Sequence, residues 1–353
     1  MKVLLIGDNL RACLVASEEL SKRGCEIDVL GWWSLKLNKR KSIKNYINWK
    51  GLTENLKSYK SRFIALLRDY DSYMAINDDA LTLLKYYWND LDDVLKSRLI
   101  GVDTKYFSVD FNSKYSILNN FNVENIPETI YLKNEKFVEN IDFNKFKVIK
   151  PEYSRYIEKG RIVIGRVEIF QGSIQPKLGE VKYPVLLQEL CEGPEMGFNF
   201  YSINGEIKCY YLDRHYFGQK GDESVAREFV RDDLPNYTDI YTTFCNSVRE
   251  MQWTGFGMFD FILQDGIVKI IEFNCRPWAS IRLGVLNDVP LFDYLLFDID
   301  QKYLVNETPG KVNVLHNLSL EIKYVLLSFF KLKFTPAFQL LGCFSKRNHY
   351  FEK

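Results

Sequence analysis

Three oxygen-bearing side chains, Asp260, Glu272 and Asn274, lie in an otherwise hydrophobic segment and together could bind a metal ion. The segment 257–276 reads as two strands around a turn, since Asp-Gly between apolar runs is typical of a hairpin. Glu272 and Asn274 are two residues apart and therefore share one strand face. Hard oxygen ligands of this kind suit Mg²⁺. The alternative is that these side chains simply face water.

The length of the turn decides whether Asp260 joins this face. A three-residue loop over 264–266 pairs Asp260 with Ile270 and directs it to the face just described. A two-residue loop pairs it with Ile271 and directs it away. Because a glycine at the end of the loop suits the left-handed conformation of the three-residue register, a cluster of three oxygen ligands is available to this hairpin.

Two lysines occupy positions at which a cation needs an anionic partner. Lys114 lies in the first turn of a helix that opens at Asn112, and the positive end of a helix disfavours a cation. An anionic ligand would resolve this conflict, and solvent exposure is the alternative. Lys150 ends the strand 146–150 and is fixed by Pro151, so an interior-facing amine is expected there. A phosphate oxygen is the obvious partner for it.

The first hundred residues predict a small α/β domain without chemistry of its own. Residues 2–31 read as strand, helix and strand, which implies parallel strands joined by a crossover helix. A strand near 73–76 precedes Asn77 and Asp78, good N-caps for a helix through Trp88. No GxGxxG follows the first strand and no GxxxxGK[ST] occurs, so both common phosphate loops are excluded.

The composition is that of an ordinary globular protein, and it argues against some classes of function. The chain has 353 residues, 46% apolar and 26% charged, with a net charge of +1. A general nucleic-acid binder would show a basic excess, so none is expected. Seven scattered cysteines without a CxxC pair indicate reduced thiols. Without a secretion signal or about 18 consecutive apolar residues, we expect a cytoplasmic protein.

In order and spacing, the motifs over residues 2–290 resemble the ATP-grasp superfamily, whose members include D-alanine–D-alanine ligase, biotin carboxylase and the carbamoyl phosphate synthetase large chain. A small α/β domain comes first and a helix lysine follows it. The motifs that carry the resemblance are Lys114 before Val123–Thr129, Val148-Ile149-Lys150-Pro151, Leu187–Leu190, Gly193-Pro194-Glu195 and Asp260 with Glu272-Phe273-Asn274.

The resemblance implies an α/β (α+β) fold class with four parts. An N-terminal parallel α/β domain, 1–105, precedes the ATP-grasp fold, whose two lobes contain antiparallel sheets. The small lobe is 106–182, and the large lobe, 183–300, contains the metal site. We expect 301–353 to be a helical extension, with a periodic helix over 318–332. Packing of this extension on the large lobe is expected, and an amphipathic surface for a partner or membrane is the alternative.

The resemblance also implies a role for each matching residue in a cleft that holds ATP. The phosphates are expected at Lys114 and Lys150, the adenine at Gln188 and at the backbone of Glu189 and Leu190, and the ribose at Glu195. Two Mg²⁺ ions, or Mn²⁺ in their place, are expected at Asp260, Glu272 and Asn274. Arg276, which together with Lys150 forms the expected catalytic pair, matches an arginine that contacts the transferred phosphate or the acceptor's carboxylate.

One segment departs from the pattern. The loop after the strand lysine is usually glycine-rich, whereas 152–161 contains a single glycine. Positive side chains there could replace backbone donors by pairing with phosphate oxygens. Lys208, Arg214 and His215 flank another hairpin and could reach a ligand, with solvated positions as the alternative.

These residues predict an ATP-dependent ligase that activates a small carboxylate as an acyl phosphate and joins it to an amine. The alternatives are a phosphotransferase that stops at a phosphorylated product and a nucleotide-binding protein without turnover. The expected partners are therefore small molecules. The oligomeric state is open, with a homodimer among the alternatives.

Overall fold

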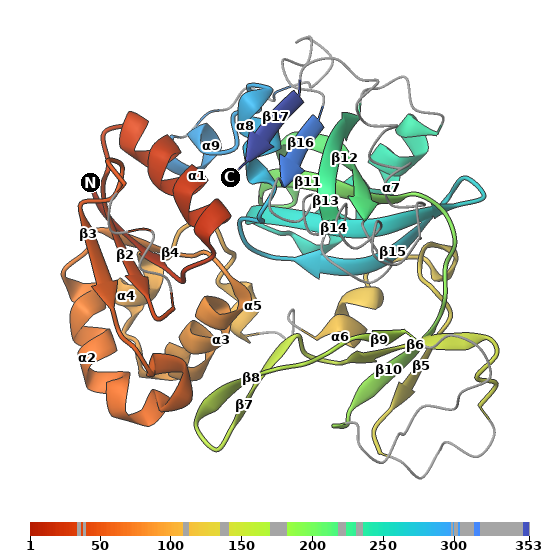
Figure 1. Cartoon of the computed structure of the whole chain (residues 1–353), viewed down its shortest axis with the longest axis horizontal. Helices are drawn as coiled ribbons and strands as arrows, with labels where there is room; N and C mark the ends of the chain where they lie inside the picture. The colour runs from red at the N-terminus through yellow and green to blue at the C-terminus, as the bar shows by residue number, and fades with distance from the viewer. Residues whose placement is uncertain are drawn as a thin grey trace, which may run out of the picture. The chain divides into compact units, whose positions relative to one another are not determined.

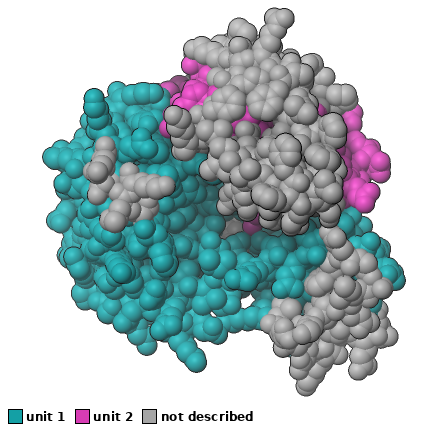
Figure 2. Space-filling view, in the orientation of Figure 1, with its two compact units in different colours: residues 1–190, 254–256, 273–279 teal, residues 191–253, 257–272, 280–353 magenta. Residues whose placement is uncertain are grey.

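The protein forms two compact units, which Figure 2 colours teal and magenta. The computed structural model describes residues 1–33, 37, 40–108, 113–134, 141–169, 182–217, 224–230, 236–297, 299, 303, 314–317 and 349–352. Unit 1 contains residues 1–190, 254–256 and 273–279, and unit 2 contains 191–253, 257–272 and 280–353. The first sheet of unit 1 is parallel, and the described strand pairs of the other sheets are antiparallel except for the parallel pair of the strands Val314–Asn317 and His349–Glu352, so the predicted mixture of α/β and antiparallel architecture is confirmed.

Unit 1 opens with the predicted strand–helix–strand. The parallel sheet has the order β3-β2-β1-β4, and its interior residues are apolar and buried because helices cover them (Figure 1). Asn77 caps α3 by accepting from the N–H of Ala80, as predicted. The elements are β1 (Lys2–Ile6), α1 (Leu10–Lys22), β2 (Glu26–Gly31), β3 (Asn45–Asn48), η2 (Leu52–Glu54), α2 (Leu56–Arg68), β4 (Ser72–Ala75), α3 (Asp78–Tyr87), η3 (Trp88–Asp90), α4 (Asp93–Ser97) and α5 (Lys105–Ser108).

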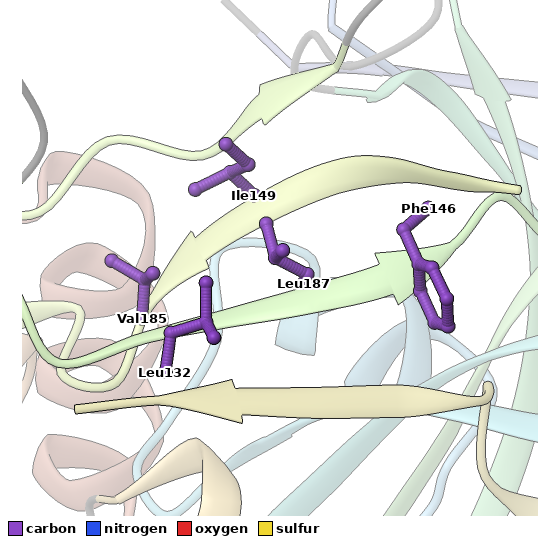
Figure 3. Packing of buried hydrophobic residues seen from close by; sticks show 5 residues of the cluster. All are labelled: Leu132, Phe146, Ile149, Val185 and Leu187. Atoms are coloured by element: carbon purple, nitrogen blue, oxygen red, sulfur yellow. The ribbon is translucent and has the colours of Figure 1, made fainter. Parts of the chain in front are cut away.

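A second, antiparallel sheet completes unit 1, in the order β5-β10-β6-β9. One of its faces is a small hydrophobic core of Leu132, Phe146, Ile149, Val185 and Leu187, shown in Figure 3. Because side chains alternate along a strand, the residues between these core positions point to the other face. The elements are α6 (Lys114–Leu118), η4 (Val123–Asn125), β5 (Thr129–Leu132), β6 (Phe146–Pro151), β9 (Glu168–Ile169) and β10 (Val185–Glu189).

The glycine-poor segment after Lys150 is a hairpin and not the predicted loop. Strands β7 (Arg155–Glu158) and β8 (Arg161–Ile164) form a two-stranded sheet around Lys159 and Gly160, both with positive φ. The hairpin contacts α3, and Gly160 accepts a hydrogen bond from the N–H of Leu56. A β-branched and aromatic sequence with a left-handed Lys-Gly turn explains why a hairpin forms here.

Unit 2 is built on a seven-stranded sheet in the order β15-β14-β11-β12-β13-β16-β17. Helix α7 covers one face, where Phe244 lies 4.6 Å from the ring of Phe198 and 5.0 Å from that of Phe259. The elements are β11 (Glu195–Ile203), β12 (Glu206–Phe217), β13 (Ser224–Val230), α7 (Tyr237–Met251), β14 (Gly255–Gln264), β15 (Ile267–Asn274), α8 (Ile281–Leu286), α9 (Asp293–Leu296), β16 (Val314–Asn317) and β17 (His349–Glu352).

Two details of this sheet revise the sequence interpretation. The β14–β15 turn has two residues, Asp265 and Gly266, with φ of 51° and 82°, so the two-residue alternative holds. Strand alternation then directs Asp260 away from the face that Glu272 and Asn274 share, so the expected cluster of three oxygen ligands on one face of the hairpin was wrong. In the C-terminal extension, β16 and β17 are strands, so this part is not helical throughout. The predicted helix over 318–332 lies outside the described residues.

Candidate functional site

Unit 1 places Lys150 and Gln188 on one face of the β5-β10-β6-β9 sheet. Lys150 pairs with Leu186, and Gln188 pairs with Val148, so the two polar side chains lie two residues apart along the ladder. Both are on the face opposite the core of Figure 3, yet Lys150 is only 7% exposed and Gln188 only 2%. A buried amine and a buried amide on one face form a polar site that favours an anionic ligand with hydrogen-bonding groups.

Gln188 has one oxygen that the described part of the chain leaves unsatisfied. Its Nε2 donates to Thr129 Oγ1 at 2.9 Å, which orients the amide. Its Oε1 is buried and accepts no hydrogen bond from any described residue. An unsatisfied buried acceptor costs about 1–3 kcal/mol, so a ligand that donates an N–H there recovers free energy. The exocyclic amine of adenine is such a donor, so the residue fits the predicted adenine contact.

Lys114 is held beside the end of β6 by Glu152. The N–H of Lys114 donates to the carbonyl of Glu152 at 2.9 Å. The Glu152 carboxylate accepts from Ser113 Oγ at 2.7 Å and from Tyr131 Oη at 2.9 Å. Ser113 is also the N-cap of α6, so the predicted helix start is confirmed. Glu152 therefore brings the backbone of Lys114 close to the strand that carries Lys150.

Strand β10 ends at Glu189, and Leu190 is the next residue, at the boundary of unit 1. The N–H of Glu189 donates to the carbonyl of Glu128 at 3.0 Å, and Glu189 Oε1 accepts from the N–H of Glu128 at 3.0 Å. These paired bonds fix the backbone at the predicted hinge. Because the N–H of Glu189 is already donated, its carbonyl is the backbone group through which it would meet a base.

Arg276 forms an ion pair with Asp78 within unit 1. Arg276 Nε donates to Asp78 Oδ1 at 2.7 Å, and Nη2 donates to Oδ2 at 2.8 Å. Nη2 also lies 3.4 Å from Asn274 Oδ1. Burial acts to raise the pKa of Asp78, but Arg276, together with Arg155 and Lys114, lowers it overall. The guanidinium is thereby held in one orientation by two charge-assisted bonds.

Unit 2 gathers Glu195, His215 and Asp260 so that one ligand atom from each lies within 4.8 Å of the others. His215 Nδ1 lies 3.3 Å from Glu195 Oε1, and its Nε2 lies 3.9 Å from Asp260 Oδ1. Arg227 Nη1 is 2.8 Å from the same Nε2. Since a guanidinium can only donate, Nε2 accepts this bond and Nδ1 carries the proton that faces Glu195. In this arrangement His215 connects Arg227 to Glu195.

A further carboxylate, that of Asp213, holds Arg227 in place beside this cluster. Asp213 Oδ2 accepts from Arg227 at 3.1 Å, and Oδ1 accepts from Asn199 Nδ2 at 2.8 Å. Burial acts to raise the pKa of Asp213, but Arg227, His215 and Asn199 lower it to about 2. Gly197 is required opposite it, because an added Cβ would lie 2.2 Å from Asp213 Oδ1. Asp213 is therefore a permanent anion that fixes Arg227.

The pKa of Asp260 is shifted in the opposite direction to that of Asp213. Burial, together with the smaller effect of the Glu195 and Glu272 charges, raises the pKa of Asp260 to about 7 against the lowering effect of His215 and Arg227. Glu195 and Glu272 both lie within electrostatic range of Asp260, and a bound cation would relieve the repulsion between these carboxylates and Asp260. An all-oxygen donor set of this kind fits Mg²⁺ or Mn²⁺. Glu195 thus belongs to the acidic cluster, although the sequence resemblance placed it at the ribose.

The residues that hold the site's side chains in place were not predicted from the sequence. Glu152, Asn199, Asp213 and Arg227 were not singled out, and His215 was left between a ligand contact and a solvated position. Their signal was the alternation of polar residues along strands that are otherwise apolar, as in Asp213 and His215 of β12.

Comparisons with solved structures identify the fold. No protein-family model and no curated protein matches the sequence. The structure is similar to an L-amino acid ligase from Bacillus licheniformis, with a TM-score of 0.63 at 14% identity over 88% of this chain and 78% of that one. It is similar to the N5-carboxyaminoimidazole synthetase of Staphylococcus aureus, with a TM-score of 0.63 at 13% identity over 90% and 82%. A biotin carboxylase–β,γ-ATP complex from Campylobacter jejuni matches with a TM-score of 0.61 at 13% identity over 83% and 69%.

These structures share the ATP-grasp fold, and the chain therefore has that fold, as its motifs predicted. The staphylococcal synthetase has also been solved with ADP, and that structure matches with a TM-score of 0.59 at 12% identity over 90% of this chain and 82% of that one. Among the described residues, no helix is long and apolar enough to cross a membrane.

Proposed function

We propose that this protein is an ATP-dependent ligase that activates a small carboxylate and joins it to an amine. The observation that supports this most directly is the buried face of β6 and β10, which contains both Lys150 and Gln188. The side-chain oxygen of Gln188 accepts no hydrogen bond from any residue that the structure describes. An amine such as Lys150 suits a phosphate, and the acceptor at Gln188 suits the amine of adenine. The similarity to ligase structures supports the same conclusion.

In this proposal each unit contributes its own groups. Unit 1 supplies Lys114 and Lys150 for the phosphates, and Gln188 with the backbone of Glu189 and Leu190 for adenine. Unit 2 supplies Glu195, Asp260 and Glu272 as oxygen ligands, and Asn274, at the end of β15, is a further candidate ligand that belongs to unit 1. A bound Mg²⁺ or Mn²⁺ would neutralise charge that develops on the phosphates.

The reaction begins with attack of the substrate carboxylate on the γ-phosphate of ATP, which gives an acyl phosphate and ADP. An amine then displaces the phosphate and forms an amide bond. Arg276, oriented by Asp78, stabilises negative charge on the carboxylate or the transferred phosphate. The described residues need to supply no covalent nucleophile, because positioning and charge stabilisation account for this type of transfer.

Calorimetry with Mg²⁺ and ATP tests the nucleotide site. Wild type is compared with Lys150→Ala and Glu272→Ala, and with Lys147→Ala, which removes a lysine from the same strand. We expect the first two variants to bind ATP at least tenfold more weakly and the control to bind it as wild type does. Phosphate release is then measured across amino acids and sugar acids, with and without amines. A wild-type protein that binds no nucleotide contradicts the proposal.

A nucleotide-binding protein without turnover is the second candidate, and the β7–β8 hairpin favours it. The segment expected to cover the phosphates, 152–161, forms most of the β7–β8 hairpin, and this hairpin is hydrogen-bonded to the N-terminal part of unit 1. Arg155 Nε donates to Asp79 Oδ1 at 2.6 Å, and Gly160 accepts from Leu56. ATP binding without phosphate release for any acid would support this candidate over the ligase. Release of a stable phosphorylated acid without any amine would instead indicate a phosphotransferase.

A further inference from the structure

Unit 1 contains a cavity of about 220 Å³ between helix α3 and the β7–β8 hairpin, which lie beside each other in Figure 1. Its lining includes three tyrosines, Tyr86, Tyr153 and Tyr156, and two cations, Lys85 and Arg155. At roughly 30 Å³ per water molecule, the volume has room for about seven waters. It is smaller than the roughly 300–1,000 Å³ of pockets that bind drug-sized ligands, so a small metabolite is the appropriate occupant.

The charges around this cavity favour an anion. Its lining includes two cationic side chains and no carboxylate. Arg155 is held in place because Nε donates to Asp79 and Nη1 donates to the carbonyl of Ser154 at 2.9 Å. Lys85 Nζ lies 5.9 Å from the centre of the Tyr153 ring, a cation–π distance that keeps the ammonium at the wall. A carboxylate can accept hydrogen bonds from both cations.

The aromatic part of the lining favours a ring. Tyrosine side chains offer flat apolar faces with a polar hydroxyl at the end, and they stack on planar rings or on the C–H face of sugars. Tyr86 lies on α3, whereas Tyr153 and Tyr156 lie in the segment that carries the hairpin. A ligand that contacts all three would therefore bridge the two elements.

The cavity also adjoins residues that the proposed function uses. Arg155 contacts Asp79, whose neighbour in the sequence, Asp78, forms the ion pair with Arg276. Two ion pairs on adjacent residues, Arg155–Asp79 and Arg276–Asp78, therefore lie next to each other between the cavity wall and the arginine expected to stabilise the activated carboxylate.

We propose that this cavity binds a small carboxylate that carries one ring, with the carboxylate at Lys85 and Arg155 and the ring against the tyrosines. Binding itself is independent of ATP. The further statement, that this acid is the one the enzyme activates, rests on the proposed function. The ring is either that of an aromatic acid or that of a sugar acid, and the two sources are distinguished by experiment.

Calorimetry on the full chain without nucleotide tests binding. The probes are 4-hydroxybenzoate for aromatic acids and glucuronate for sugar acids, with acetate and benzyl alcohol as controls that lack the ring or the charge. We expect one ring acid to bind and both controls to bind at least tenfold more weakly. Lys85→Gln and Tyr86→Ala should each weaken the ring acid at least tenfold. Arg161→Gln, which removes a charge from the same hairpin outside the cavity, should leave its affinity unchanged.

Three results would overturn the proposal: no binding of either ring acid at millimolar concentration, equal binding of acetate, or affinities that Lys85→Gln and Tyr86→Ala do not change. If Tyr86→Ala lowers the melting temperature strongly, Lys85→Gln decides, because its half-buried side chain is polar in both forms. A ring acid that binds here but does not stimulate phosphate release from ATP leaves the cavity assignment intact. That result would contradict only the role of this acid as substrate.

Discussion

Replacing Gln188 by leucine should affect the empty protein and its nucleotide affinity in opposite ways. In the structure, Gln188 is 2% exposed, and its Oε1 has no donor among the described residues. Leucine removes this acceptor, whose burial costs about 1–3 kcal/mol, and also the Nε2–Thr129 bond, worth about 0.5–1.5 kcal/mol. Thr129 remains bonded because its Oγ1 donates to the carbonyl of Pro127 at 2.7 Å. The unfolding free energy should therefore stay within about 1 kcal/mol of wild type or rise.

The affinity for ATP should fall in the same variant. Loss of the hydrogen bond from the adenine amine to Oε1 is worth about 1–2 kcal/mol, which corresponds to roughly 5–30-fold. Gln188→Glu, which keeps an acceptor at this position, should retain ATP binding. Urea unfolding measures the first quantity, and calorimetry with Mg²⁺ and ATP measures the second. Unchanged ATP affinity in Gln188→Leu would refute the adenine assignment.

Two further substitutions test the support of the site. Asp78→Asn weakens the pair with Arg276 and should lower the unfolding free energy by about 1–2 kcal/mol at pH 7. Because the folded-state pKa of Asp78 is lowered, chiefly by Arg276 against the effect of burial, its contribution is present above about pH 4 and is lost as the pH falls. The difference from wild type in urea unfolding should then close below pH 4, and a constant difference would contradict this reasoning. Gly197→Ala would place a Cβ 2.2 Å from Asp213 Oδ1, so it should destabilise unit 2 by about 1–3 kcal/mol and weaken Mg²⁺-dependent ATP binding. The control is Gly160→Ala, whose added Cβ meets no atom within 4 Å but whose φ of 77° strains an alanine; it should lower the unfolding free energy and still retain ATP binding.

The features that the sequence predicted correctly are those that depend on residues only a few positions apart in the chain. The N-cap Asn77, the helix with Lys114 in its first turn, the strand that ends near Lys150 and the crossover unit over 2–31 are all present as predicted. Capping, strand alternation and turn chemistry depend on neighbours in the chain, so they are visible in the sequence. The order of such motifs was also enough to predict the ATP-grasp fold.

Turn length was the local feature that the sequence left open. Gln264-Asp265-Gly266 is compatible with two-residue and three-residue loops, and the structure has the two-residue turn. The segment after Lys150 was interpreted from its expected role as a loop. Its alternating aromatic and β-branched residues, with Lys159 and Gly160 at the turn, form a hairpin instead.

The sequence by itself predicted most of the elements and the candidate residues of the site: the lysines, Gln188 and the acidic side chains of unit 2. Only the tertiary structure decided what surrounds each of them. Arg276 meets Asp78 across 198 residues, and Glu152 joins Ser113 across 39. Burial that raises the pKa of Asp260 to about 7 likewise depends on strands that are distant in the chain. Such contacts arise from the packing of whole elements, and a side chain's own sequence neighbours do not encode them.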